Sequence, residues 1–366
     1  MTWIAQTDLA THVFAPQGIG KPEPAKAEKT PVTADEILPV GTLLIEARSR
    51  VDAETDQPII HFHAGRPWLR EMDITLQKDG VLSLEFTQGT AQSQAHIRLP
   101  YPPHDSRMRI TYSWNAPKRT GRLTVELLDL GQLFQVSLYD PVPLPLADIR
   151  IIARNGGRIT ISQSVEFIAV SDAVEPVGFG MGVTSGTLVE TAHGTMPVER
   201  LRLGDEVVTA TSGLRPVRWI GKREVPALGS LRPVLLRAPF FGLERDLLLA
   251  PDHRLRLDFD DADYMLGTDD VLLAASHLVN GKQAHRDDST PLVSYYQVLL
   301  DVHDCLLHHG IWGESLFVGT IRRRPDVAAT TVLGDLPASA LPEHRAFSRH
   351  QLSTMEARSL AATLRA

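Results

Sequence analysis

The chain has 366 residues, of which 43% are hydrophobic and 22% are charged, and its formal net charge is -7 at pH 7. These values are typical of a soluble protein with two or three domains. The excess of acidic residues argues against a nucleic acid or an anionic membrane surface as partner. No apolar run approaches the roughly 18 residues that a membrane-spanning helix needs, so no membrane span is predicted.

The cysteine content and the N-terminus bear on the compartment. The single cysteine, Cys305, excludes an intrachain disulfide bond. The first residues, MTWIAQTDLATHVFAP, lack the basic start and the apolar core of a cleaved signal peptide. The sequence therefore predicts either a cytoplasmic protein or a protein exported by a non-classical route.

The N-terminal half changes character near residue 37. Residues 1–36 are predicted to be an arm or linker, because the stretch 17–36 is rich in proline, alanine and charge. Residues 37–175 consist of short runs with a period of two, separated by turn signals such as the Lys-Asp-Gly at 78–80, and predict an antiparallel β-sandwich of the jelly-roll type. The expected strands lie within 43–51, 74–86, 95–100, 107–114, 121–128, 134–140, 148–154 and 158–170.

The order of these expected strands resembles that of concanavalin- and laminin-G-like sandwiches, in which a strand such as GVLSLEF precedes a charged strand with alternating aromatics. The resemblance implies a glycan or a protein as partner, held by exposed aromatic side chains. The aromatic candidates are Trp68, Tyr101, Tyr112 and Trp114. For Tyr112 and Trp114, alternation with Met108 and Ile110 favours a place in the core.

A second organisation begins with the tract GVTSGTLVETAHGTMPVERLRLGD, from Gly182 to Asp205. It resembles the opening of a bacterial Hint domain, the fold of Hedgehog C-terminal domains and inteins. Three later blocks continue the resemblance in the family's order: RDLLLAPDHRLRL, VLLAASHLV and YYQVLLDVHDCLLHHGIWGESLFVG. The resemblance implies an all-β, horseshoe-like Hint domain over residues 178–325, related to protein autoprocessing by acyl shift and self-cleavage.

Two residues of the family's chemistry are missing. In the family a cysteine, serine or threonine stands four residues before a Gly-Thr pair and attacks the preceding carbonyl. Here the pair lies at 186–187, so Gly182 occupies the nucleophile's position. The family's Thr-x-x-His motif begins with Ala250 and ends with His253, which keeps the histidine without the threonine hydroxyl. The resemblance implies that His253 is a general acid with no nucleophile to serve.

Other residues of the expected cleft offer partial replacements. Asp301 and His303 form an Asp-x-His pair in the last block, where the fold would bring a carboxylate next to the nucleophile's position. Thr184 and Ser185 carry the nearest hydroxyls to Gly182 and are alternative nucleophiles. Strand alternation turns Ser185 away from a cleft that position 182 faces, so a turn and strand-start role is the favoured interpretation of both.

Two classes of function remain open. The first is a Hint-domain protein that does not cleave itself and acts as a structural or ligand-binding module, which Gly182 and Ala250 favour. The second is an active self-cleaving protein that uses Thr184 or Ser185 with His253 as general acid. Splicing with excision is excluded, because no His-Asn pair closes the domain. The interpretation leans toward a protein that is not an enzyme.

No cofactor and no metal site are predicted. Cys305 lies in an alternating, mostly apolar run where a buried thiol is the usual outcome, although His303 would share its face. The fourteen histidines are scattered, and the pair His61 and His63 has no second half-site at a recognisable spacing. His277 is interpreted as a structural histidine at a strand end.

The last segment, residues 326–366, is predicted to be a linker followed by a helix. The tail from Glu343 to Leu364 resembles the Arg- and Leu-rich C-terminal helix of bacterial Hint proteins. The basic run 322–324 before it is interpreted as a solvated linker, with a cleavage or partner site as the alternative. Apolar residues at helical spacing imply that the helix docks on the body or on a partner. These residues are Leu352, Met355, Leu360 and Leu364.

Overall fold

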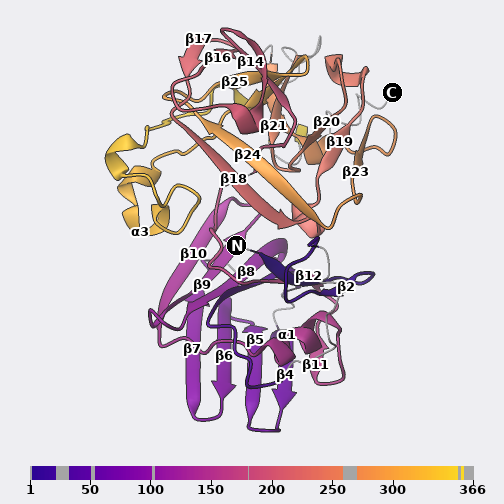
Figure 1. The fold of residues 1–366 in the computed structure, drawn as a ribbon, viewed down its shortest axis with the longest axis vertical. Coiled ribbons are helices and arrows are strands. Elements are labelled where there is room, and N and C mark those ends of the chain that lie inside the picture. The colour runs from indigo at the N-terminus through magenta and orange to yellow at the C-terminus, as the bar shows by residue number, and fades with distance from the viewer. Residues whose placement is uncertain are drawn as a thin grey trace. The chain divides into compact units, whose positions relative to one another are not determined.

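The structure is a computed structural model, and it describes residues 2–21, 33–50, 54–100, 104–179, 181–258, 270–352 and 356–357. The chain divides into two compact units, Met1–Val177 and Gly178–Ala366 (Figure 1). Both units consist mainly of antiparallel strands, so the predicted mostly-β fold class is confirmed. In the described part of the chain, no helix has the length and apolarity to cross a membrane.

Unit 1 is a sandwich of a seven-stranded and a five-stranded antiparallel sheet. The larger sheet has the strand order β10-β9-β8-β3-β12-β1-β2, and the smaller has the order β11-β4-β5-β6-β7. The strands of the larger sheet are β1 (Trp3–Thr7), β2 (His12–Phe14), β3 (Val40–Arg50), β8 (His104–Asn115), β9 (Thr120–Leu127), β10 (Gln132–Tyr139) and β12 (Val165–Ser171). Those of the smaller sheet are β4 (Gln57–Ala64), β5 (Arg70–Leu76), β6 (Val81–Gln88), β7 (Ala91–Arg98) and β11 (Ile159–Ile161).

Alternation along the strands builds the core of this sandwich. In β8, Met108, Ile110, Tyr112 and Trp114 all belong to the core and are fully buried. The Tyr112 hydroxyl and the Trp114 indole N–H each donate a 2.8 Å hydrogen bond to a backbone carbonyl oxygen. The predicted core role of these two rings is confirmed, which removes them as stacking partners for a ligand. Tyr101 lies outside the described residues.

One predicted strand of unit 1 is a helix. The run 148–154 lies almost entirely in α1 (Leu146–Ala153), although its sequence reads as an alternating strand. The buried residues Ile149, Ile152 and Ala153 are spaced by three and four, so they cover one side of a helix. Burial of that helical face decided the structure, and the strand prediction for this run was wrong.

The N-terminal residues differ from the predicted arm. β1 lies between β12 and β2 in the larger sheet, and all five of its residues are buried. Trp3 and Ile4 are among the least exposed apolar side chains of the chain. Their burial stabilises the strand, so the arm prediction is corrected for residues 3–14. Residues 22–32, in the middle of the predicted linker, lie outside the described residues.

Unit 2 contains a six-stranded sheet and a nine-stranded sheet. The first has the order β18-β24-β13-β20-β19-β23, and the second has the order β15-β14-β16-β25-β26-β21-β22-β27 with β17 paired to β16. The six strands are β13 (Val183–Thr184), β18 (Trp219–Pro226), β19 (Val234–Leu236), β20 (Leu247–Leu249), β23 (Ala284–Arg286) and β24 (Leu292–Leu299). The nine are β14 (Leu188–Thr191), β15 (Gly194–Pro197), β16 (Glu206–Thr209), β17 (Gly213–Pro216), β21 (Arg254–Asp258), β22 (Asp270–Ala274), β25 (Cys305–His308), β26 (Ile311–Glu314) and β27 (His350–Gln351).

The helical segments of unit 2 are short and lie in its connections. Among the described residues most are single 3-10 turns that join strands, α3 is one turn of α-helix, and residues 356–357 are also helical. They position the connections and also contribute buried side chains to the core, among them Val198, Ala275 and Leu278. The segments are η1 (Val198–Arg200), η2 (Gly229–Leu231), η3 (Phe240–Gly242), η4 (Ala275–Leu278), η5 (Ile321–Arg323), α3 (Pro325–Ala328) and η6 (Ala338–Ala340).

The C-terminal tail was predicted to be helical; it is extended over residues 343–352 and helical at the described residues 356–357. Residues 343–352 contain no helix and end in β27, which pairs in parallel with β22. The pairing and the burial of Leu352 outweigh the helical spacing of the tail, so the helix prediction is wrong for this stretch. Met355, Leu360 and Leu364 lie outside the described residues. The basic run 322–324 is anchored rather than free, because two of its arginines pair with Glu343.

Candidate functional site

Gly182 lies directly before β13, which is an interior strand between β20 and β24. Its carbonyl oxygen accepts a 2.8 Å hydrogen bond from the Ala250 N–H. A Cβ atom built on Gly182 would overlap the carbonyl oxygen of Tyr296 and lie 3.0 Å from its carbonyl carbon. Because backbone atoms of a paired strand cannot move aside cheaply, position 182 has no room for a side chain.

His253 ends the tight turn that begins at Ala250. The His253 N–H donates to the Ala250 carbonyl oxygen at 3.1 Å, so the turn places the histidine a few residues from the strand that pairs with Gly182. The ring is 5% exposed and packs against β26, where a Cβ on Gly313 would come within 2.7 Å of its Nε2. The same Cβ would lie 2.8 Å from Cδ2 of His308. A glycine at 313 thus lets two histidine rings pack on one strand.

Burial keeps both of these histidines neutral. It lowers the pKa of His253 to about 4 and the pKa of His308 to about 3, since a positive charge would be poorly solvated there. The two ring centroids are 6.4 Å apart, so the charge on one ring would also disfavour charging the other. Within the described residues, Nε2 of His253 and Nδ1 of His308 have no hydrogen-bond partner. Each ring is therefore a buried, neutral group.

A buried carboxylate lies next to this pair. Glu314, at the end of β26, accepts hydrogen bonds from the backbone N–H and the guanidinium of Arg254 at 3.0 and 3.1 Å. Burial raises the pKa of Glu314, but the nearby His303 ring and the charge of Arg254 outweigh burial and hold the pKa below its ordinary value. Glu314 is therefore an ionised group that offsets the charge of Arg254.

His303 contacts this carboxylate and not the nucleophile's position. Its Nε2 lies 3.6 Å from the Glu314 Oε2, and its Nδ1 accepts a 3.0 Å hydrogen bond from the Ser348 N–H. An Nδ1 that accepts leaves the proton of the neutral ring on Nε2, facing the carboxylate. His303 is thus a structural partner of Glu314, fixed by the C-terminal tail.

Asp301 does not join the histidines as the sequence predicted. Its carboxylate is about one-third exposed and lies 3.6 Å from Nη1 of Arg215. The buried carboxylate of this segment is instead Asp304, which accepts hydrogen bonds from the backbone and side chain of Thr211 and from the Ser212 N–H. Asp304 therefore fixes the loop at Thr211 and Ser212, and Asp301 pairs with Arg215.

The two alternative nucleophiles are engaged in structural hydrogen bonds. The Thr184 hydroxyl donates to the Leu248 carbonyl oxygen at 2.9 Å and is part of the β13 to β20 connection. The Ser185 hydroxyl bonds to Glu199, whose carboxylate also accepts the Gly186 N–H at 2.9 Å. These bonds support the turn and strand-start interpretation of both residues.

The remaining candidates are the single cysteine and three histidines outside the expected cleft. Cys305 is fully buried, and burial raises the pKa of its thiol to about 12, which agrees with the predicted core role. His61 and His63 each pair with a carboxylate of β5 at 2.6 Å. His277 lies in η4 after β22. Over the residues that the structure describes, no group of three or more His, Cys, Asp or Glu is arranged to hold a metal ion.

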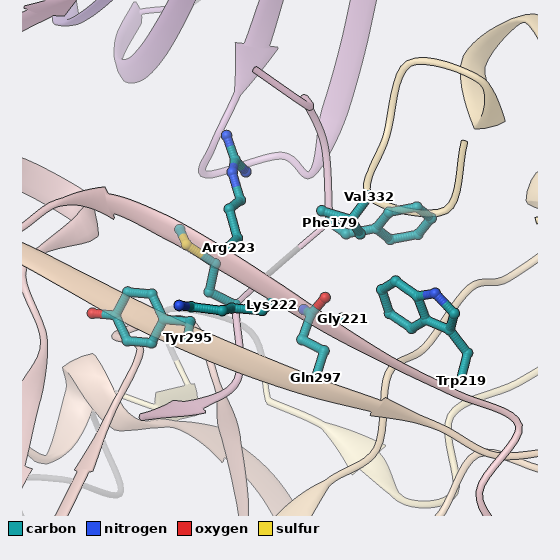
Figure 2. Close-up of a pocket in the computed structure, with 9 residues that line it drawn as sticks. Phe179, Trp219, Gly221, Lys222, Arg223, Tyr295, Gln297 and Val332 are labelled. Carbon is teal, nitrogen blue, oxygen red and sulfur yellow. The ribbon is translucent and has the colours of Figure 1, made fainter. Parts of the chain in front are cut away.

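A small cavity lies against the paired strands β18 and β24 and includes Met181 in its lining (Figure 2). Its volume of about 10 Å³ admits roughly one water molecule. Figure 2 shows Gln297 directed toward Gly221 and the Trp219 ring lying beyond it. The cavity is thus too small for a substrate. Its lining residues are Phe179, Met181, Trp219, Gly221, Lys222, Arg223, Tyr295, Gln297 and Val332.

The family model described as the Hint domain matches residues 181–320. This part of the chain is therefore a Hint domain, and the prediction from the four sequence blocks is confirmed. No curated protein matches the chain.

Several solved structures resemble one or the other unit. The carbohydrate-binding module CBM40 of a Ruminococcus gnavus IT-sialidase, bound to α2,3-sialyllactose, has 13% identity and a TM-score of 0.29, over 49% of this chain and 89% of that chain. A bacterial intein-like domain from Clostridium thermocellum has 14% identity and a TM-score of 0.27, over 37% of this chain and 99% of that chain. A leech intramolecular trans-sialidase has 13% identity and a TM-score of 0.28, over 52% and 32%.

Proposed function

We propose that this chain is a Hint-domain protein that has lost self-cleavage and keeps the fold as a structural or ligand-binding module. The observation that carries the proposal is the steric exclusion at Gly182, where a side chain would overlap the Tyr296 carbonyl oxygen. An acyl shift needs an attacking side-chain atom at this place. β13, which directly follows position 182, pairs with β24, and the backbone of β24 occupies the space that a nucleophile at position 182 would need.

The state of His253 supports the same proposal. A general acid must hold a proton at the working pH, and a group with a pKa of about 4 is protonated in only about one molecule in a thousand at pH 7. His253 would therefore be a poor proton donor to a leaving amide nitrogen. Ala250, which replaces the family's threonine, adds a buried methyl group and no hydroxyl.

Intact mass spectrometry tests this proposal. The purified chain, incubated at neutral pH with dithiothreitol or dilute hydroxylamine, should remain whole at 40.3 kDa. Fragments that meet at Met181–Gly182 would overturn the proposal. A cut before Thr184 or Ser185 would support the alternative nucleophiles, and alanine at each position would identify the hydroxyl. The Asn-Gly bonds at 155–156 and 280–281, which harsher hydroxylamine treatment cleaves, give fragments of different mass.

We further propose that unit 1 supplies a binding surface for a glycan, with Trp68 as the stacking residue. Trp68 is half-buried in a loop whose backbone is fixed by Arg70, which donates to the Arg66 and Trp68 carbonyl oxygens at 3.0 and 3.4 Å. Arg70 is itself held by a buried 2.7 Å ion pair with Asp148. A rigid loop presents an aromatic face with little loss of entropy on binding.

A glycan array with three proteins tests the role of Trp68. The unmodified chain and a Tyr139→Ala variant, which removes an exposed aromatic elsewhere in unit 1, should bind the same glycans. Trp68→Ala should lose this binding. Equal binding by all three proteins would exclude Trp68, and a blank array for the unmodified chain would leave a protein as the partner of unit 1.

A further inference from the structure

The C-terminal segment Phe347–Leu352 lies on unit 2 as an extended peptide. Its strand β27 adds to the edge of β22 in parallel, with His350 opposite Val271 and Gln351 opposite Leu272. The Leu352 N–H then donates to the Leu272 carbonyl oxygen at 3.2 Å. Addition of an extended peptide to a sheet edge is a recurring mode of recognition, in which the backbone gives affinity and alternate side chains give specificity.

The first side chain of the segment fills an aromatic slot. The Phe347 ring stacks on Phe317, with 3.9 Å between centroids and an interplanar angle of 24°. It meets the His303 ring edge-on at 5.5 Å, and the Arg254 guanidinium lies 5.3 Å from its centroid on another side. Three side chains from different elements thus converge on one aromatic ring.

The next inward side chains make a charged and an apolar contact. Nε of Arg349 lies 2.6 Å from the Asp270 carboxylate, in a pair that is only about one-seventh exposed on either side. Leu352 is 8% exposed and joins the core of unit 2. His350 and Gln351, between them, face solvent. The segment therefore carries an aromatic residue, an arginine two positions later and a leucine three positions after that.

The unit also contacts the peptide backbone through a side chain. The Ser348 N–H donates to Nδ1 of His303, and the same histidine faces Glu314. His303 is 8% exposed under this segment. The groove is thus formed by the β22 edge, Asp270, Arg254, His303 and Phe317. It contacts both the backbone and the alternate side chains of an extended peptide.

We propose that this groove is a peptide-recognition site and that the C-terminal segment of the chain is its ligand, bound in cis. The ligand class is an extended peptide with an aromatic residue, an arginine at +2 and a leucine at +5. A tethered ligand has a high effective concentration, so a peptide in trans binds only when the segment is released. The proposal does not depend on whether the Hint domain cleaves itself.

The test uses the full chain with Phe347→Ala and Arg349→Ala together, which should release the segment. Diethyl pyrocarbonate modifies accessible neutral histidines, and mass spectrometry of peptides gives the rate at each site. We expect His303 to react about tenfold faster or more in the variant, because the segment that covers it opens more often. His61 and His63, with half-exposed side chains, serve as the internal reference and should react at an unchanged rate.

A peptide added in trans tests whether the groove recognises this sequence or whether the segment only shields His303 from solvent. The peptide RAFSRHQL, from Arg345 to Leu352, should restore the protection of His303 in the double variant. A control peptide with alanine in place of Phe347 and Arg349 contains the same histidine but should not protect His303. Unchanged His303 reactivity in the folded double variant would overturn the proposal, and so would exposure that the peptide does not reverse.

A milder variant covers the case in which the double variant unfolds, which circular dichroism and the reference histidines would reveal. Arg349→Gln keeps a polar, unbranched side chain and removes one charged contact, so it should raise the His303 rate by a smaller factor that the peptide again reverses. No change in rate with this variant would overturn the proposal. The intact mass of every sample reports self-cleavage separately, so failure of the proposed function would appear as fragments.

Discussion

The two sides of the Hint site differ in what they have kept. On the nucleophile side, position 182 is a glycine, and the Tyr296 carbonyl oxygen of β24 lies where a Cβ atom would be. On the acid and base side, His253, His308 and Glu314 remain buried and closely packed. The histidines fill space between strands, whereas a nucleophile needs open space beside it. Under the proposed function, the histidines of this site have a packing role.

The buried histidines of the acid and base side should make the stability of the protein depend on pH, and this is the largest effect that we expect. The pKa values of His253 and His308 are lowered by burial to about 4 and 3, against 6.5 in the unfolded chain. Between these pKa values the unfolded state binds more protons than the folded state. The free energy of unfolding is therefore highest above pH 6.5 and falls as the pH drops toward 4. With about 1.4 kcal/mol per pKa unit, we expect a loss of more than about 4 kcal/mol between pH 7 and pH 4.

Urea unfolding at several pH values measures this loss. The effects of His253 and His308 belong to the pair, because the two rings interact. His253→Gln should flatten the pH dependence below pH 6.5, since one buried proton acceptor is removed. A curve that is flat from pH 7 to pH 5 in the unmodified chain would contradict the burial of neutral histidines.

The nucleophile side should respond most to a restored side chain. Gly182→Cys should destabilise unit 2 by about 3 kcal/mol, the upper end of the range for overpacking, because β24 must move away from the new Cβ. Gly157→Cys is the matched control, since a Cβ there meets nothing within 4 Å. Equal stability of the two variants would show that β24 yields easily. The first would then be expected to cleave slowly in thiol after Met181.

The packing of the histidines on β26 is the next test of the comparison. Gly313→Ala should cost about 2 kcal/mol, because the new methyl group meets Nε2 of His253 and Cδ2 of His308. His308→Ala should cost stability by itself but should recover part of the Gly313→Ala loss when the two are combined. Additive losses in this double-mutant cycle, measured by urea unfolding, would mean that Gly313 does not accommodate the His308 ring.

Much of the fold could be predicted because the strands of both units alternate clearly. The core positions of Tyr112 and Trp114 followed from that alternation, and the Hint domain followed from ordered blocks of sequence. Errors arose where two periods fit the same residues. The run 148–154 alternates like a strand, yet Ile149 and Ile152 also lie on one side of a helix, and only packing decides between them.

The site was harder to predict because the pairing register of distant strands decides which of its residues lie close together. His253 could be placed from its motif, but the roles of His308 and Glu314 depend on how β26 pairs with β25 on one side and with β21 on the other. Asp301 and Asp304 are three residues apart, and the sequence alone did not indicate that the second is the buried one. The overlap at Gly182 also involves a backbone atom of Tyr296, which leaves no trace in residue identity.

The smallest expected effect distinguishes a structural hydroxyl from a reacting one. Thr184→Val keeps the shape of the side chain and removes the 2.9 Å hydrogen bond to the Leu248 carbonyl oxygen. A buried hydrogen bond of this kind contributes about 1 kcal/mol, so urea unfolding should show a loss of that size. Intact mass should be unchanged, since the hydroxyl holds β13 to the segment around β20. If the unmodified chain shed its N-terminal unit and Thr184→Val stopped this, Thr184 would be the nucleophile and the nucleophile side would be active.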